Sequence, residues 1–200
     1  MSSDNSLLHN IQRCSWAEEH ELLRNYHDHE WGVPVHDDRM LFELLVLEGA
    51  QAGLSWLTVL KKREAYREVY RGFNPEIIAT WTERDIERCV ADAGIIRNRR
   101  KIESSVNNAR RFIETAGESG SFDSYIWKFV NGTTIHNTWQ TIKDIPATTD
   151  ISDRMGRDMK KRGFSFAGST ICYAFMQSAG MVNDHVTGCF RYRELAGLQQ

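Results

Sequence analysis

Two pairs of candidate metal ligands stand near opposite ends of this chain. Cys14 and His27 form the pattern C-x12-H near its start, and His185 and Cys189 form the pattern H-x3-C near its finish. Structural zinc sites take four cysteine and histidine ligands in a tetrahedron. One site built from all four residues would hold the two ends of the chain together. The chain between the two pairs must then fold so that its end returns close to its start. Cysteine and histidine are common residues, and the spacing alone is also compatible with coincidence.

Composition limits the class of protein. The chain has 200 residues, of which 41% are hydrophobic and 26% charged, as in ordinary soluble globular proteins. This length suffices for one domain, or for two small lobes that share a cleft. No apolar run approaches the roughly 20 residues that span a bilayer, and residues 1–13 lack the pattern of a signal peptide. We therefore expect a cytoplasmic protein, with Cys89 and Cys172 as buried thiols rather than partners in disulfides.

Helix signals dominate the pattern of apolar residues, and strand signals are nearly absent, so the sequence predicts an all-α fold. Asp37 and Asp38 are candidate caps of a helix with one buried face, and the segment from Thr82 to Asp85 resembles a capping box. The longest expected connection is the threonine-rich segment 131–149. Helices are expected through residues 40–47, at about 56–70, from 82 to before 94, at about 97–115 and at 121–130.

A second pattern lies between Ser152 and Gly180 and predicts a helix, a tight turn and a second helix. The first helix is basic and ends at Gly163, the turn runs to Gly168, and an apolar helix begins near Ser169. Glycines at both ends of the turn allow close approach to another surface, and free N–H groups at a helix start bind anions. A DNA phosphate fits such a turn, although a plain corner between two helices has the same pattern.

The net charge of −2 is unevenly distributed along the chain. Residues 1–50 carry ten acidic and three basic residues, whereas two later segments are strongly basic. Solvated helix faces explain either cluster by itself, but two basic clusters beside glycine turns also suit contacts with DNA phosphates. The clusters consist of Arg97, Arg99, Arg100, Lys101, Arg110 and Arg111, and of Arg154, Arg157, Lys160, Lys161 and Arg162.

Five segments carry a resemblance to a known family. They are Arg13-Cys14-Ser15-Trp16, the run from Tyr26 to Pro34, the run from Leu47 to Trp56, Lys161-Arg162-Gly163-Phe164, and the run from Asn183 to Cys189. In this order they resemble the 3-methyladenine DNA glycosylase I family, which belongs to the helix-hairpin-helix glycosylases and removes alkylated adenine from DNA. The likeness extends from about residue 13 to residue 189.

The resemblance implies a helix-hairpin-helix glycosylase fold whose N- and C-terminal segments are joined by one structural zinc ion. We expect residues 13–190 to form a single globular domain of two helical lobes around a cleft, with a flexible extension at 1–12 and a tail at 191–200. The expected partners are alkylated double-stranded DNA and the product 3-methyladenine, without a membrane, and the expected state is a monomer.

The resemblance also assigns roles to particular residues. Glu48 matches a glutamate that lines the base pocket and is the candidate catalytic residue, although an exposed acid at a helix end would give the same local pattern. A flipped purine stacks on flat rings, and a cationic methylated base favours them further. The candidate ring residues, each also explained by core packing alone, are Trp16, Tyr26, Trp31 and Trp56. The candidate DNA contacts are Lys161, Arg162, Gly163, Phe164 and Gly168, with Leu54 as a wedge or a core residue.

The chemistry expected from this resemblance is hydrolysis without strand cleavage. Bifunctional relatives carry a lysine just after the hairpin, where this chain has Ser169 and Thr170. Asp184 is either a catalytic carboxylate or, as we favour, a residue that orients His185. The alternative function is a zinc-stabilised module that binds damaged DNA without catalysis, and a Glu48→Gln substitution separates the two. A zinc deaminase is less favoured, because its H-x-E and P-C-x-x-C signatures are missing.

Overall fold

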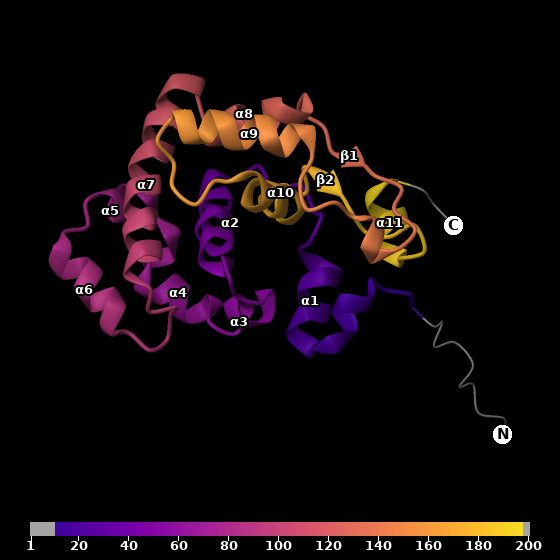
Figure 1. Ribbon diagram of the computed structural model, residues 1–200, viewed down its shortest axis with the longest axis horizontal. Coiled ribbons are helices and arrows are strands. Elements are labelled where there is room, and N and C mark those ends of the chain that lie inside the picture. Colours follow the sequence, from indigo (N-terminus) through magenta and orange to yellow (C-terminus); the bar gives the residue numbers. More distant parts are fainter. Residues whose placement is uncertain (1–10, 198–200) are drawn as a thin grey trace.

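The computed structural model describes residues 11–197 and is built almost entirely of helices (Figure 1). The helices are α1 (Glu21–His29), α2 (Asp38–Gln51), α3 (Trp56–Leu60), α4 (Arg63–Val69), α5 (Pro75–Ala79), α6 (Glu83–Ala91), α7 (Arg99–Ser119), α8 (Phe122–Trp127), α9 (Asp150–Lys161), α10 (Ser169–Ser178) and α11 (Phe190–Leu195). Strands β1 (Ile135–His136) and β2 (Val182–Asn183) and 3-10 turns at Ser15–Glu19, Arg71–Phe73, Lys128–Val130 and Ile142–Asp144 complete the described elements. The all-α prediction is confirmed.

Helix α2 lies at the centre of the fold, where it packs against α3, α7, α8 and α10 (Figure 1). Every residue from Leu41 to Ala50 is buried. The sequence predicted one buried face, and this prediction was too narrow, because neighbours surround the helix on all sides. Glu43 and Glu48 are therefore carboxylates inside the core rather than on its edge.

The capping residues fix where helices begin. Asp37 accepts a hydrogen bond from the Met40 amide at 2.9 Å, as predicted for the start of α2. Asp38 instead accepts from the amides of Phe122 and Asp123, and thereby caps α8. The predicted capping box at the start of α6 is confirmed.

The helix predicted over residues 56–70 is divided into α3 and α4 by a break at Lys61 and Lys62. Val59 and Tyr66 are both buried and lie seven residues apart, which is two helical turns. The apolar periodicity therefore continues across the break and hides it from the sequence pattern. Helix α7 begins at Arg99 and ends four residues beyond the predicted end.

The predicted helix, turn and helix are present as α9, the turn 162–168 and α10. Gly163 has φ of +88°, a conformation that favours glycine. On α9, a Cβ atom at Gly156 would lie 3.2 Å from the backbone of Ala167 and Ser169. The absence of a side chain there lets α9 pack directly against the end of the turn.

The connection from 131 to 149 contains strand β1, which pairs with strand β2 near the C-terminal end of the described residues. Strands β1 and β2 run parallel, with Ile135 opposite Val182 and His136 opposite Asn183. This pairing leads directly into the segment that carries His185 and Cys189, beside the N-terminal segment. Figure 1 shows the segment before α1 and helix α11 on the same side of the molecule.

Two boundaries predicted from the sequence fall at the limits of the described residues. Most of the expected extension at 1–12 lies outside them, as do the last three residues of the expected tail. Within the tail, α11 continues to Leu195. None of the described helices combines the length and the apolar character needed to cross a membrane.

Candidate metal centre and adjoining cavity

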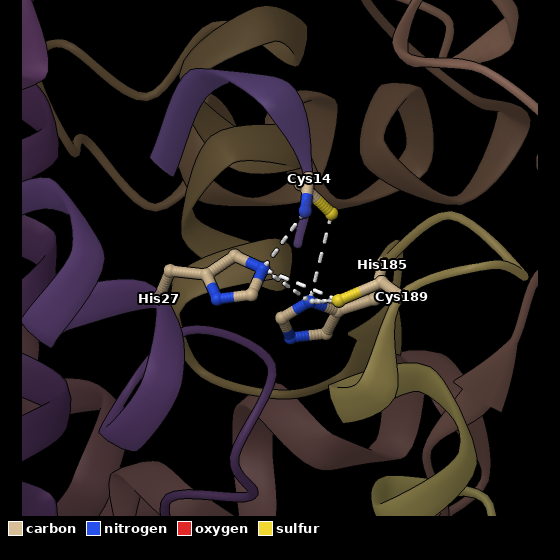
Figure 2. A group of neighbouring side chains, drawn as sticks. All are labelled: Cys14, His27, His185 and Cys189. Atoms are coloured by element: carbon tan, nitrogen blue, oxygen red, sulfur yellow. Dashed lines mark hydrogen bonds between the residues drawn. The ribbon is translucent and has the colours of Figure 1, made fainter. Parts of the chain in front are cut away.

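Four buried side chains from the two ends of the chain converge on one point (Figure 2). Nδ1 of His185 lies 3.1 Å from Nε2 of His27, 3.7 Å from Sγ of Cys14 and 3.6 Å from Sγ of Cys189. Ligand atoms about 2.0–2.3 Å from a tetrahedral zinc ion are separated from one another by roughly 3.3–3.8 Å. The four atoms all lie within 4.8 Å of one another, so they fit a small metal ion with little movement.

Hydrogen bonds at the far side of each imidazole orient the ligand nitrogens. Nδ1 of His27 lies 2.7 Å from the carboxylate of Asp28, which is itself held by Arg13. Nε2 of His185 lies 3.0 Å from the carbonyl oxygen of Trp31. Each of these contacts requires the imidazole to donate, which leaves the other nitrogen free to face the cluster as a ligand.

The two thiols of the cluster strongly affect each other. The pKa of Cys14 is raised by its hydrogen bond to Cys189 and by burial. The same hydrogen bond lowers the pKa of Cys189. Metal ligands must be deprotonated, so a metal ion at this cluster would displace the proton that Cys14 holds.

Aromatic rings separate the cluster from a neighbouring cavity. The ring of Trp16 packs edge-on against His27 with centroids 5.3 Å apart, and the ring of Trp31 packs edge-on against His185 at 4.6 Å. The two tryptophan rings meet at 5.1 Å. These contacts place both indoles directly against the imidazoles of the cluster.

The cavity has a volume of about 370 Å³, enough for a purine base. All five residues predicted to bind the base border it, which brings together residues up to 40 positions apart. Sequence reasoning missed its other half, which comes from α10, the end of α2 and the connection 131–149. The lining residues are Trp16, Tyr26, Trp31, Glu48, Gln51, Trp56, Ile142, Ile145, Pro146, Ala147, Thr170, Tyr173, Ala174 and Gln177.

Two polar groups in the cavity wall are buried at a cost in stability. Burial raises the pKa of Glu48 to about 8, partly opposed by the hydroxyl of Ser178. The indole N–H of Trp56 is buried without a hydrogen-bond partner among the described residues. A buried donor without a partner and a carboxylate without a cation both cost stability, and sites for polar cationic ligands accept such costs.

Asp184 does not orient His185, contrary to the interpretation from the sequence. Its carboxylate is 1% exposed and accepts hydrogen bonds from Tyr173 and Gln177, which line the cavity, and from two side chains of the connection 131–149. The His185 imidazole is instead oriented by the backbone carbonyl of Trp31. The only sequence signal for the α10 wall is the spacing of Thr170, Tyr173, Ala174 and Gln177, which places them on one helix face.

The loop after α2, between the cavity residues Gln51 and Trp56, carries an exposed apolar side chain. Gly53 has φ of +76°, and the next residue, Leu54, is 42% exposed. The ammonium group of Lys101 donates to the carbonyl oxygens of Ala50 and Ala52 at 2.8 and 2.6 Å. A cation at the C-terminal end of α2 thus anchors the loop that carries Leu54.

The hairpin residues differ in their availability for DNA. Lys161, Gly163 and Gly168 are exposed. The ring of Phe164 is only 5% exposed and belongs to the core, so its side chain is not available for the DNA contact expected from the sequence. The guanidinium of Arg162 pairs with Asp158 and Glu118, so it already has acidic partners within the fold.

Comparisons with known proteins agree with the site. The profile of a family described as methyladenine glycosylase matches residues 16–192. DNA-3-methyladenine glycosylase 1 of Escherichia coli (strain K12) is 48% identical over 182 residues, covering 91% of this chain and 97% of that protein. DNA-3-methyladenine glycosylase of Haemophilus influenzae is 48% identical over 179 residues, covering 88% of this chain and 96% of that protein.

Solved structures show the same similarity. A crystal structure of 3-methyladenine DNA glycosylase I is 49% identical, with a TM-score of 0.87, and the alignment covers 90% of this chain and 98% of that one. A single-residue variant of 3-methyladenine DNA glycosylase I in complex with 3-methyladenine is 36% identical, with a TM-score of 0.86, and covers 89% of this chain and 96% of that one.

Proposed function

Because the chain belongs to the methyladenine glycosylase family, we propose that it removes 3-methyladenine from alkylated DNA in base-excision repair. The observation that carries this function is the cavity, in which the carboxyl group of Glu48 lies among aromatic rings. The chain that forms this cavity aligns over nine-tenths of its length with such a glycosylase. The reaction breaks the N-glycosyl bond between the base and the sugar, and water supplies the new oxygen at the sugar carbon.

The cavity residues support binding of a flipped, cationic base. Tyr26 and Trp56 meet at a centroid distance of 5.3 Å and offer ring surfaces for stacking. Glu48 supplies negative charge, which favours a cationic methylated adenine over a neutral adenine. Alkylation at N3 already makes adenine a good leaving group, and flipping costs least for a damaged base. Selective binding of the extruded base therefore provides much of the catalysis.

We also propose that the four-residue cluster holds one zinc ion per chain. Two thiolates and two imidazoles with oriented nitrogens are the donor set that zinc takes in structural sites. All four positions of the tetrahedron belong to the protein, so the ion would stabilise the fold and take no part in hydrolysis. Its role would be to hold residues 14–27 against residues 185–189.

The remaining features of the proposal concern DNA. Lys161, Gly163 and Gly168 contact the phosphate backbone, and Leu54 fills the gap that the flipped nucleotide leaves. Ser169 and Thr170 stand where a Schiff-base lysine would be needed, so the DNA strand stays intact. The active species is a single chain whose residues 13–190 act as one domain.

The first experiment is to incubate the purified protein with methylated DNA and to identify the bases released. Release of 3-methyladenine without strand breaks is expected from the wild type, with a much slower release from the Glu48→Gln variant. Damage-dependent binding without release would instead indicate a non-catalytic recognition module. A Glu87→Gln variant, which changes an exposed acid outside the cavity, serves as the matched control.

A further inference from the structure

The carboxylate of Asp184 is saturated by four hydrogen bonds behind the α10 wall of the cavity. Its Oδ1 accepts from Nδ2 of Asn137 at 2.7 Å and from Nε1 of Trp139 at 2.8 Å. Its Oδ2 accepts from the hydroxyl of Tyr173 at 2.6 Å and from Nε2 of Gln177 at 2.7 Å. Tyr173 and Gln177 border the cavity, whereas Asp184 lies behind them. All four donors are neutral groups.

This arrangement fixes the polarity of the wall. A carboxylate oxygen accepts hydrogen bonds and does not donate, so the end of the Gln177 amide that faces Asp184 must be the NH₂ group. The carbonyl oxygen of that amide then faces away from Asp184. The hydroxyl hydrogen of Tyr173 is likewise directed to Asp184, which leaves only its oxygen lone pairs for the cavity. Tyr173 and Gln177 thus keep the phenol oxygen and the amide carbonyl oxygen as acceptors for a bound base, and their one further donor is the second N–H of the Gln177 amide.

We propose that Asp184 is a positioning residue that makes this wall accept hydrogen bonds, and that Gln177 thereby selects between methylated purines. The carbonyl oxygen of Gln177 accepts from the exocyclic amine of adenine and opposes the carbonyl oxygen that guanine carries at the same ring position. This inference rests on the proposed function and deepens it, because it names the group that favours 3-methyladenine over 3-methylguanine.

An Asp184→Asn substitution tests this inference, because the neighbouring donors also determine which way the new amide group points. The Trp139 indole can only donate, so it holds the carbonyl oxygen of the new amide. The new NH₂ group then faces Tyr173 and Gln177, and the Gln177 amide must turn over to accept from it. The cavity wall now presents a donor in place of an acceptor, with almost no change in shape.

The measurement is kcat/KM for excision of 3-methyladenine and of 3-methylguanine from otherwise identical DNA. The ratio between them is expected to fall at least about tenfold in Asp184→Asn, because the wrong hydrogen-bonding group in a buried site discriminates strongly. The same fall is expected for Gln177→Leu, which removes the acceptor but leaves Asp184 in place. Asn137→Ala, which removes a donor from the opposite oxygen outside the cavity, should keep the wild-type ratio.

A structural role alone would slow excision of both bases equally and leave the ratio unchanged, and that result overturns the inference. Asp184 precedes His185, so the melting temperature and metal content of each variant are measured as well. If Asp184→Asn fails to fold, the ratio in Gln177→Leu decides. A wild type that releases no 3-methyladenine would refute the proposed function itself, whereas normal wild-type release with unchanged ratios would refute only the inference.

Discussion

Replacing Glu48 with glutamine should stabilise the protein at alkaline pH while it impairs excision. Burial raises the pKa of this carboxyl from 4.5 to about 8, so the folded state holds a proton that the unfolded state releases between these pH values. Stability of the wild type should therefore fall as the pH rises from about 4.5 to about 8. Each tenfold change in proton affinity is worth about 1.4 kcal/mol, which gives an upper limit of about 5 kcal/mol for the whole range.

Glutamine has nearly the same shape and does not ionise, so the Glu48→Gln variant lacks this contribution. Urea unfolding at pH 5, 7 and 9 should give similar free energies for the two proteins at pH 5. At pH 9 the variant should be the more stable one by a few kcal/mol. Every other titrating group is common to both proteins, so the difference between their curves reports on position 48 alone.

Two outcomes decide whether the reasoning holds. The contrary outcome is that the free energies of unfolding of the wild type and of the Glu48→Gln variant change in parallel from pH 5 to pH 9. In that case ionising Glu48 costs the folded state no free energy, and the argument from burial is refuted. The exposed Glu87→Gln variant supplies the control and should follow the wild type throughout. A stabilised variant with reduced excision would show that the fold bears the cost of this carboxylate for the sake of the cationic base.

Four further predictions concern the same cavity and its surroundings. For excision, kcat/KM should rise with pH and level off above about 8, because pairing with a cationic base requires ionised Glu48, whereas the Glu48→Gln profile should be flat. Trp56→Phe keeps a stacking ring but removes the unpaired indole N–H, so binding of 3-methyladenine in calorimetry should weaken about tenfold while the free energy of unfolding stays equal or rises. Leu54→Ala should slow excision from duplex DNA roughly tenfold but leave single-stranded substrate and the melting temperature unaffected, since the side chain is exposed; equal slowing on both substrates would exclude the wedge. Cys14→Ala should remove bound metal in elemental analysis and lower the unfolding free energy by a large part of the ~10 kcal/mol that a structural zinc contributes; unchanged stability without metal would rule out the clasp.

The parts of the molecule that the sequence predicts well are those specified by residues close together in the chain. Asp37 caps α2 through a contact three residues away, and the turn before α10 is marked by its own glycines. The four cluster residues lie far apart in the chain and were still predicted together. Zinc accepts few ligand types, and each of the two pairs has a recognisable spacing. Chemistry that admits few alternatives can be recognised even when its residues, such as Cys14 and His185, lie 171 positions apart.

The α10 wall and the connection 131–149 could not be predicted in this way. Ile142 and Pro146 form part of the cavity only because β1 pairs with β2, and a two-residue pairing leaves almost no pattern in sequence. Asp184 was assigned to the residue beside it in the chain, whereas its actual partners include Asn137, 47 positions earlier. Hydrogen bonds between distant segments depend on packing that no local pattern encodes.

The cluster and the cavity are formed by adjacent residues and share two of their aromatic side chains. Tyr26 and His27 are adjacent on α1, where successive side chains point about 100° apart, so one borders the cavity while the other reaches the cluster. Trp16 and Trp31 each touch an imidazole of the cluster and line the cavity as well. The cluster therefore supports the part of the cavity wall that Trp16 and Trp31 form. Trp16 and Trp31 belong to the N-terminal part of the chain, and the C-terminal ligand His185 packs against Trp31 from behind, so joining the two ends holds this wall in place.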